Sequence, residues 1–286
     1  MNALPDDDFV RDLLKRALDE DLGRGGDVTS HAIFAAGQCA EAAILAKEAG
    51  VLSGAWLIAP LYAMVDPAVA VESCAEDGNR LARGSCIARI RGPVRGILAG
   101  ERVILNFLQR MSGIATATAA LVAAVSHTDA VILDTRKTTP TLRPLERRAV
   151  RDGGGRNHRF GLYDMVLIKD THVRASGGVA NAIRAVRRSL GCPAPVAIEA
   201  EVQSYEEFLE ALAEKPDRIM LDNMSCEQMG RCVDHARAAG SSIELEASGN
   251  VSLETVAAIA ETGVGFISSG AITHSAKALD IHLKII

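Results

Sequence analysis

Six short apolar runs recur in the second half of the chain, and each is followed by a polar loop and an amphipathic segment. The runs are AVILDTRK, DMVLIKD, PVAIEAEV, DRIMLDN, SIELEAS and VGFISSG, between residues 130 and 270. The segments after them include NAIRAVRRSL, SYEEFLEALAE, SCEQMGRCVDHARAA and SLETVAAIAETG. Short apolar strands that alternate with helices are typical of parallel strands joined by right-handed crossovers. The pattern therefore predicts an α/β fold for this half.

Charged or small polar residues stand at the C-terminal edge of every run. In chain order they are Asp134, Arg136 and Lys137; Lys169; Glu201; Asp222 and Asn223; Ser248 and Gly249; Ser269 and Gly270. An open parallel sheet concentrates its site at one switch point, whereas a barrel gathers its site from all strand ends. The even distribution therefore predicts a barrel of parallel strands.

The alternation of residues within two runs predicts carboxylates inside this barrel. Glu199 and Glu201 share one face of their strand, and Glu244 and Glu246 share one face of theirs. Helices coat the outside of a barrel, so the apolar face should point outward and the carboxylates inward. A buried carboxylate is costly unless it is paired or binds something. We expect inward lysine and arginine partners, with Lys169 as the first candidate.

The first half of the chain has a different organisation. An amphipathic helix is predicted near residues 9–20, followed by a Gly/Asp turn at 23–27 and by short strand-like runs that Gly and Pro separate. A long Ala- and Leu-rich helix is predicted over 101–126. These features predict a small α+β module in front of the barrel.

Composition and charge exclude several classes of protein. The 286 residues are 48% hydrophobic and 23% charged, which fits a packed globular protein. A net charge of -5 argues against the broad basic surface that non-specific nucleic-acid binding needs. The acidic start has no signal-peptide core, and no apolar stretch is long enough to span a bilayer. Six cysteines without a CxxC pair predict reduced thiols and no structural zinc. We expect a cytoplasmic protein without nucleic-acid or membrane partners.

Basic residues gather in the segment 134–170. They are Arg136, Lys137, Arg143, Arg147, Arg148, Arg151, Arg156, His158, Arg159 and Lys169. A solvated or interfacial helix surface accounts for Arg147, Arg148 and Arg151. The others follow strands or a Gly-Gly-Gly loop, where ligands are met, and planar guanidinium groups suit carboxylates and phosphates. An acidic protein with such a pocket is expected to bind a polyanionic small molecule.

Two acids and two late loops complete the candidate site. Glu201 and Asp222, at successive strand ends, suit a magnesium-pyrophosphate substrate, with a structural salt-bridge network as the alternative. The loops 248–250 and 269–271 contain small residues and each precedes a helix, a common arrangement for phosphate at the last two loops of a barrel.

The chain resembles quinolinate phosphoribosyltransferases from end to end. The matching motifs are ALDEDLGRGGDVTS, ERVILNFLQRMSGIATAT, DTRKTTP, RAVRDGGGRNHRFGLYDMVLIKDTH, IMLDNM, LEASGNV and GAITHSAKALDI. Three departures stand out: Thr141 where the family usually has Gly, Thr171 where it usually has Asn, and Glu199-Ala200-Glu201 where Glu-Val-Glu is more usual. Thr141 alters a loop that calls for a flexible residue.

The resemblance implies an incomplete α/β barrel of parallel strands with an N-terminal open α/β sandwich. The implied domains are 1–108, joined by the C-terminal segment 274–286, and 109–273. The implied reaction transfers the phosphoribosyl group of phosphoribosyl pyrophosphate to quinolinate with loss of CO2, giving nicotinate mononucleotide and pyrophosphate in NAD biosynthesis. Mg²⁺ is expected to accompany the donor. The resemblance also implies a homodimer and leaves a higher oligomer open.

The same resemblance implies a role for each matching residue. Quinolinate is expected to contact Thr135, Arg136, His158, Arg159 and, from the neighbouring subunit, Arg102. Catalytic roles are expected for Lys137, Lys169, Glu201 and Asp222, the two acids also holding the metal. The 5′-phosphate loops are expected at Ser248, Gly249, Asn250, Ser269, Gly270 and Ala271.

Two other readings remain open at this point. One is a paralogue of the same fold with a different acceptor, as in proteins of molybdate-transport operons that resemble this family. The retained basic residues speak against it. The other is a non-catalytic anion-binding protein, which predicts loss of the acids, whereas Glu201 and Asp222 are both present.

Overall fold

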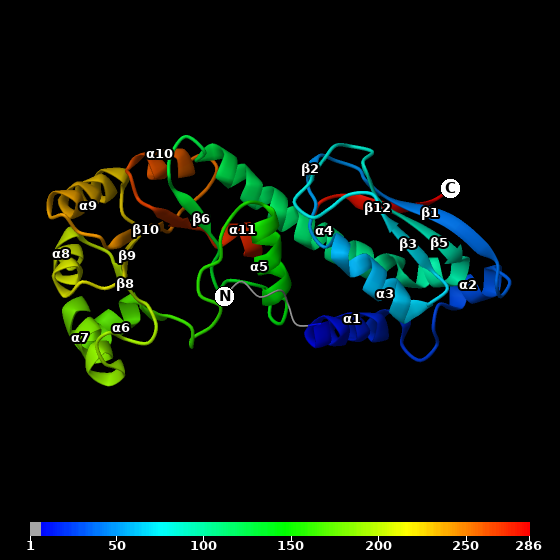
Figure 1. Cartoon of the computed structure of the whole chain (residues 1–286), viewed down its shortest axis with the longest axis horizontal. Coiled ribbons are helices and arrows are strands. Elements are labelled where there is room, and N and C mark those ends of the chain that lie inside the picture. The colour runs from blue at the N-terminus through cyan, green and yellow to red at the C-terminus, as the bar shows by residue number, and fades with distance from the viewer. Residues whose placement is uncertain (1–6) are drawn as a thin grey trace. The chain divides into compact units, whose positions relative to one another are not determined.

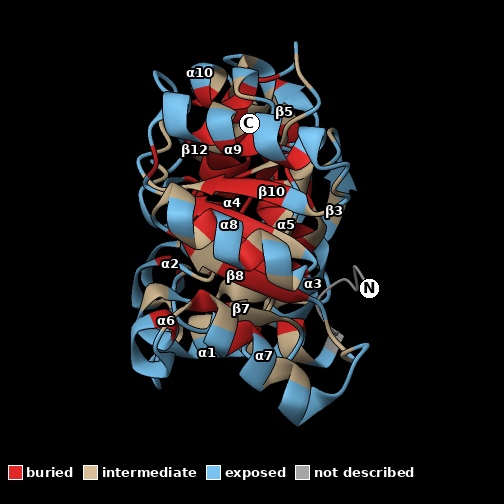
Figure 2. Ribbon diagram, turned by 90° about the vertical axis from the view of Figure 1, so that its left-hand side faces the viewer, coloured by how far each residue is buried: buried red, intermediate tan, exposed pale blue. Residues whose placement is uncertain are grey.

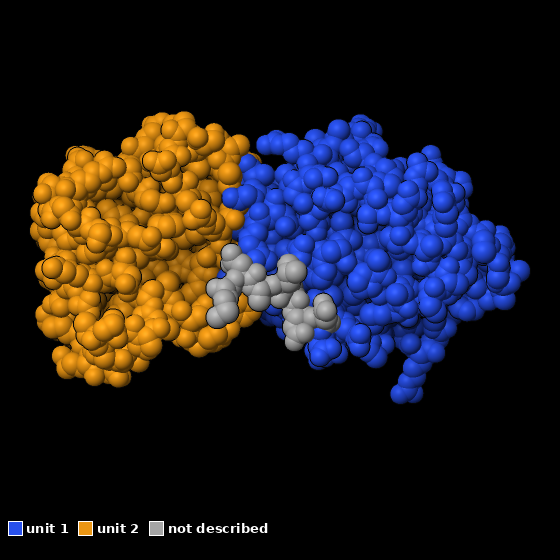
Figure 3. All heavy atoms as spheres, in the orientation of Figure 1, with its two compact units in different colours: residues 1–119, 139–154, 276–286 blue, residues 120–138, 155–275 orange. Residues whose placement is uncertain are grey.

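The computed structural model describes residues 7–286 and divides into two compact units (Figures 1 and 3). Unit 1 comprises Met1–Ala119, Thr139–Gly154 and Ala276–Ile286, and unit 2 comprises Ala120–Thr138 and Gly155–Ser275. The boundary between them lies within the long helix α4 (Val94–Ala124), C-terminal to the domain boundary expected at 108/109. The segment 139–154, expected within the barrel domain, packs with unit 1.

Unit 1 is built on a four-stranded antiparallel sheet with the order β12-β1-β5-β3. Its strands are β1 (Cys39–Ala46), β3 (Ala70–Ser73), β5 (Cys86–Pro93) and β12 (Ile281–Ile285), and β2 (Gly50–Val51) pairs with β4 (Arg80–Leu81). Its helices are α1 (Asp7–Leu22), α2 (Val28–Ile33), the 3-10 turn η1 (Ala55–Leu57), α3 (Ile58–Val65), most of α4, and α5 (Arg143–Asp152). The last strand of the chain thus pairs with the first. Helix α4 begins at Val94, seven residues before the start expected for the long helix at 101.

Unit 2 contains six parallel strands in the order β6-β11-β10-β9-β8-β7. They are β6 (Val131–Leu133), β7 (Val166–Ile168), β8 (Ile198–Val202), β9 (Arg218–Asp222), β10 (Glu244–Ser248) and β11 (Phe266–Ser268). Leu133 forms one further parallel bridge with Arg156, and within residues 7–286 no pairing joins β6 to β7. The sheet is therefore an incomplete α/β barrel, which confirms the predicted fold class.

The crossover helices of unit 2 turn apolar faces to buried strands and polar faces to solvent, as Figure 2 shows for α8 and α9 over β8 and β10. These helices are α6 (Asp170–Ser176), α7 (Val179–Leu190), α8 (Tyr205–Glu214), α9 (Cys226–Ala238), α10 (Val256–Glu261) and α11 (Ala271–His274). Ser204 and Ser225 cap α8 and α9 by accepting from backbone N–H groups. Such caps satisfy donors that the first helical turn leaves unpaired, and so they fix where each helix begins after its strand. Within residues 7–286, no helix combines the length and apolar character needed to cross a bilayer.

Candidate active site

A pocket of about 150 Å³ lies at the C-terminal ends of the strands of unit 2. It is lined by Thr135, Arg136, Lys137, His158, Arg159, Leu167, Lys169, Glu201, Met220, Asp222, Ser248 and Ser268. Nine of these were predicted as site residues from the sequence. The structure brings them together because parallel strands end on one side of a barrel. Leu167, Met220 and Ser268, which were not predicted, line the pocket because they share the inward face of their strands.

Lys137 is held in place by the loop after β6 and by helix α11. Its N–H donates to Oγ1 of Thr135 at 3.1 Å, and its carbonyl accepts from Oγ1 of Thr273 at 2.8 Å. A Cβ on Gly270 would lie 2.8 Å from Cδ of Lys137. Gly270 thus leaves room for the lysine side chain, and the phosphate contact expected of this glycine stays a prediction.

Asp134 organises the loop that carries His158 and Arg159. Its carboxylate is fully buried and accepts from the N–H of His158 at 2.7 Å and from Nδ2 of Asn157 at 2.6 Å. Asp134 follows β6 directly, so its carboxylate ties the 155–159 loop to this strand end. The sequence marked Asp134 only as one of several strand-end residues.

The arginines of the pocket crowd one another. Arg159 is nearly buried, and its Nη1 donates to the carbonyl of Met165 at 3.1 Å. Burial, and then the positive charge of Arg136, lowers the pKa of the Arg159 guanidinium. Two guanidinium groups close enough to repel each other favour a bound anion between them.

Glu201 and Asp222 form an acidic edge of the same pocket. Burial, and then the negative charges of Asp222 and Asp170, raises the pKa of Glu201 to about 7, while Lys169 opposes that rise. Asp222 accepts from Nδ2 of Asn223 at 2.8 Å. Carboxylates that repel each other in a partly buried place are suitable ligands for a hard divalent cation such as Mg²⁺.

The predicted phosphate loops follow β10 and β11, and only Ser248 of them lines the pocket. Gly249 and Asn250 both have positive φ, at 89° and 52°. Ser269 is buried, and its N–H donates to the carbonyl of Leu133 at 3.0 Å, so this N–H supports the sheet and is not directed at a ligand. Gly270 and Ala271 begin α11.

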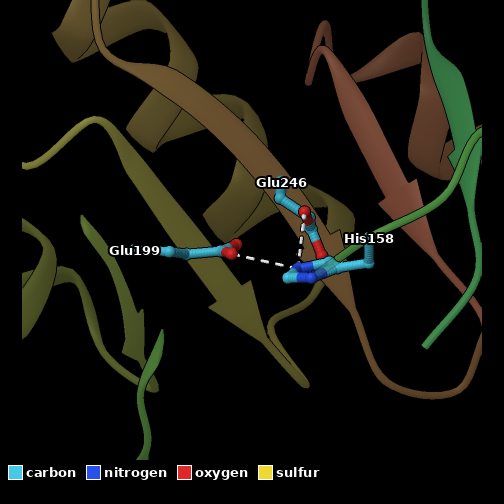
Figure 4. A group of neighbouring side chains, drawn as sticks. All are labelled: His158, Glu199 and Glu246. Atoms are coloured by element: carbon cyan, nitrogen blue, oxygen red, sulfur yellow. Dashed lines mark ion pairs between the residues drawn. The ribbon is translucent and has the colours of Figure 1, made fainter. Parts of the chain in front are cut away.

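A buried ionic cluster lies beneath the pocket (Figure 4). Nε2 of His158 is 3.0 Å from Oε2 of Glu199 and 3.6 Å from Oε2 of Glu246. Nη1 of Arg218 lies 2.9 Å from Oε2 of Glu246. The carboxylates of Glu199 and Glu246 do point inward, as predicted, and Arg218 is an inward arginine partner of the expected kind. Lys169 interacts with Glu201, whereas Glu199 and Glu246 have His158 and Arg218 beside them. Lys169 directly follows β7, at the level of Glu201. It therefore lies closer to the mouth of the barrel than Glu199 does.

Titration in this cluster is set mainly by burial. Burial raises the pKa of Glu199 to about 7. Burial, and then the charge of Glu199, raises the pKa of Glu246 to about 7. Burial lowers the pKa of His158. The cluster therefore favours neutral His158 and holds less negative charge near neutral pH than two ordinary glutamates would.

Not all predicted residues belong to the pocket. Arg102 is exposed on α4 in unit 1. Arg148, expected on a solvated helix surface, is instead packed over the ring of Trp56 at 4.7 Å and lies 3.5 Å from Oδ2 of Asp77. Thr171 is exposed near the start of α6 and does not line the pocket.

Comparison with known proteins identifies relatives over nearly the whole chain. The family model for the N-terminal domain of quinolinate phosphoribosyl transferase matches residues 27–112, and that for the C-terminal domain matches residues 114–284. The chain is 45% identical to the chloroplastic carboxylating nicotinate-nucleotide pyrophosphorylase of Oryza sativa subsp. japonica, over 96% of this chain and 77% of the relative. It is 42% identical to the probable carboxylating nicotinate-nucleotide pyrophosphorylase of Bacillus subtilis (strain 168), over 96% of this chain and 93% of the relative. The structure of the nicotinate-nucleotide pyrophosphorylase from Francisella tularensis matches with a TM-score of 0.92 at 38% identity, over 100% of this chain and 98% of that one.

Proposed function

The chain belongs to the quinolinate phosphoribosyltransferase family, and we propose that the pocket of unit 2 is where it carries out the family's reaction. In this reaction quinolinate displaces pyrophosphate from phosphoribosyl pyrophosphate, and the product loses its 2-carboxylate as CO2 to give nicotinate mononucleotide. The enzyme is a phosphoribosyltransferase of NAD biosynthesis.

The observation that carries this assignment is the division of the pocket into a basic and an acidic part. Arg136 and Arg159 both line the basic side, where the ring carboxylates of quinolinate would offset the positive charge of Arg136 that, after burial, lowers the pKa of Arg159. Glu201 and Asp222 form the acidic edge, where developing positive charge on the ribose would be stabilised as the C–O bond to pyrophosphate breaks. Lys137 and Lys169 offer ammonium groups for the departing pyrophosphate or the substrate carboxylates.

The decarboxylation step needs little further machinery. Attachment of the ribose makes the pyridine ring a cation, and this cation absorbs the electron pair that CO2 leaves behind. The chain's part is to hold the carboxylates in a fixed orientation between its guanidinium groups. Preorganised cations do this without reorganising during the reaction.

Mg²⁺ fits the acidic edge. Glu201 and Asp222 would hold it, because burial, and then the charge of Asp222, raises the pKa of Glu201, and a divalent cation would stabilise both carboxylates. When bound, the ion neutralises the charge of the pyrophosphate group. We further propose a cytoplasmic homodimer in which Arg102 of one subunit serves the pocket of the other.

The direct test is an assay with purified protein, phosphoribosyl pyrophosphate, Mg²⁺ and quinolinate labelled in its 2-carboxylate. Release of labelled CO2 together with equimolar pyrophosphate supports the assignment. Nicotinate is the control acceptor: it leaves one set of cations unpaired, which is expensive in a buried pocket, so it should be a poor substrate. Comparable turnover of nicotinate would point to a paralogue, and no turnover of either acceptor would point to an anion-binding protein.

A further inference from the structure

The buried cluster beneath the pocket has no role in the steps above. Glu199 and Glu246 are both fully buried, on the inward faces of β8 and β10, which flank β9, and Figure 4 shows both carboxyl groups directed at the ring of His158. Burying two carboxyl groups beside each other is costly, and packing alone does not require it. The cost of burying these two carboxyl groups suggests that they have a role toward the group they face, the ring of His158.

The hydrogen bonds of His158 determine which ring nitrogen carries the proton. The N–H of Arg159 donates to Nδ1 at 2.7 Å, so Nδ1 acts as an acceptor and the proton of the neutral ring is on Nε2. Nε2 is the atom that faces Oε2 of Glu199 at 3.0 Å and Oε2 of Glu246 at 3.6 Å. The backbone hydrogen bond at Nδ1 thus fixes the tautomer, and the two carboxyl oxygens lie beside Nε2 as charged contacts, without the alignment of a hydrogen bond.

This geometry argues against the other use of such a trio, which is to bind a metal ion. His158, Glu199 and Glu246 offer three ligand atoms within 4.8 Å of one another. A metal on Nε2 would require the proton to move to Nδ1, where it would oppose the N–H of Arg159. In addition, Oε2 of Glu246 already accepts from Nη1 of Arg218 at 2.9 Å, which places a fixed positive charge beside any cation.

Arg218 anchors the cluster from the opposite end of the barrel. Its guanidinium lies over the ring of Phe266 at 3.9 Å, and it reaches Glu244 as well as Glu246. A guanidinium held by three neighbours is a rigid support for Glu246. The contacts run from Arg218 through the Glu246 and Glu199 carboxyl groups to Nε2 of His158, whose ring lines the pocket.

We propose that Glu199 and Glu246, anchored by Arg218, are positioning residues that hold the ring of His158, whose tautomer the N–H of Arg159 sets, in one orientation at the floor of the quinolinate pocket. The kinetic part of this proposal rests on the proposed function. The structural part, the placement of the His158 ring by the two carboxyl groups, does not.

The tautomer is measured on the free protein. Long-range ¹H–¹⁵N spectra of histidine-labelled protein at pH 8 show seven rings, and the signal missing from His158→Gln identifies His158. The wild type should show the Nε2–H form alone. Glu199→Leu, which removes the carboxyl group beside Nε2, should keep this tautomer but move the Nε2 and Nε2–H signals of His158, and Glu199→Gln, which keeps an oxygen at this place, should restore most of the wild-type signal positions.

The kinetic measurement distinguishes positioning from general damage. Glu199→Leu should raise KM for quinolinate by about 10-fold or more with a change of no more than about 3-fold in KM for phosphoribosyl pyrophosphate, as expected for a misplaced contact to one substrate. Glu199→Gln should recover most of the loss. In the His158→Gln background, Glu199→Leu should add little, because contacting residues are not additive. Glu244→Gln is the matched control, since it removes the charge of an exposed glutamate but keeps an oxygen that accepts from Arg218, and it should leave KM for quinolinate unchanged.

Should Glu199→Leu fail to fold, the double variant Glu246→Leu/Arg218→Met removes both charges of the neighbouring pair and leaves neither one unpaired. The same two readouts then apply. Unchanged Nε2 and Nε2–H signals of His158 together with an unchanged KM for quinolinate in folded Glu199→Leu, or in the double variant where only that protein folds, overturn the proposal. A wild-type protein that shows the expected tautomer but never turns over quinolinate overturns the proposed function instead.

Discussion

The side chain of Asn223 fills the space that a Cβ on Gly249 would need. Both residues have positive φ, Asn223 in the loop after β9 and Gly249 in the loop after β10. Asn223 donates from Nδ2 to Oδ2 of Asp222 at 2.8 Å and accepts from Nδ2 of Asn250 at 3.2 Å. The absence of a side chain at Gly249 therefore lets the second loop close over the amide that holds the Asp222 carboxylate.

Gly249→Ala should displace this amide and disturb the acidic edge. We expect kcat/KM for phosphoribosyl pyrophosphate to fall by at least about 10-fold, because a small shift of a positioned group is expensive in catalysis. Gly240→Ala is the control, since Gly240 also has positive φ, 60°, but a Cβ there meets nothing within 4 Å. Equal activity of the two variants in steady-state assays would contradict the role given to this close approach.

Lys137→Ala and Lys169→Ala should each lower turnover by at least about 100-fold, the scale of losing one preorganised electrostatic group. Both side chains line the pocket, and neither supports the core, so the melting temperature should change little. Lys277→Ala removes a lysine whose side chain is 87% exposed and should leave turnover unchanged. Near-normal turnover in both pocket variants would assign these lysines to a structural role.

Thr141 adopts a φ of 69°, which is unfavourable for a β-branched residue and agrees with its place at a position where the family usually has Gly. Thr141→Asn should raise the free energy of unfolding by about 0.5–1 kcal/mol, because Asn tolerates this conformation better. Thr141→Val keeps the branch at Cβ and should bring no gain. Urea unfolding of the three proteins checks this, and equal stability of all three would show that the loop relaxes without strain.

Glu246→Gln should change how stability depends on pH. Burial and Glu199 raise the pKa of Glu246 to about 7 in the folded state, against 4.5 for an ordinary glutamate. Between these values the folded state binds the proton more tightly than the unfolded state, so stability falls as pH rises from about 4.5 to 7. Gln does not titrate, so the variant should lose at least about 1 kcal/mol less than wild type between pH 5 and pH 8. Parallel pH profiles in urea unfolding would refute the prediction, and Glu244→Gln should parallel wild type.

The sequence was sufficient to predict the barrel and the side of it that carries the site. In PVAIEAEV and SIELEAS, the alternation of residues between the two faces of a strand predicted that Glu199 and Glu246 lie inside the barrel. The ends of the apolar runs predicted the places of Lys137, Lys169 and Asp222. Both inferences need only the local sequence pattern. The partners of the buried glutamates need the order of strands in the sheet, which local periodicity does not give. Arg218 lies four residues before Asp222 in DRIMLDN, so both side chains are on the same face of the strand. This spacing could have predicted an inward arginine.

Two other features could not be found from local patterns. The segment 139–154 follows the first strand of the barrel yet packs in unit 1, where Glu146 is buried and accepts from Arg110 and from Thr139. Its pattern of apolar and polar residues is the same as that of a helix that connects two barrel strands, so the sequence pattern alone does not assign it to unit 1. Likewise the tautomer of His158 depends on the N–H of the next residue, a contact that only the loop conformation creates.

Arg102 provides the last prediction, because it lies in unit 1 while the other predicted substrate contacts lie in unit 2. If the homodimer shares its sites, Arg102→Ala and Lys169→Ala proteins are each nearly inactive but complement each other after subunit exchange. Half of the dimers at equal mixing are heterodimers with one intact site of two, so activity should recover to about a quarter of wild type. Lys137→Ala mixed with Lys169→Ala is the control, since both defects lie in the same unit and no mixed dimer has an intact site. Recovery in the first mixture alone, with exchange shown by mass spectrometry of differently tagged subunits, supports Arg102 acting in trans; no recovery despite exchange places Arg102 in its own subunit's site or outside any site.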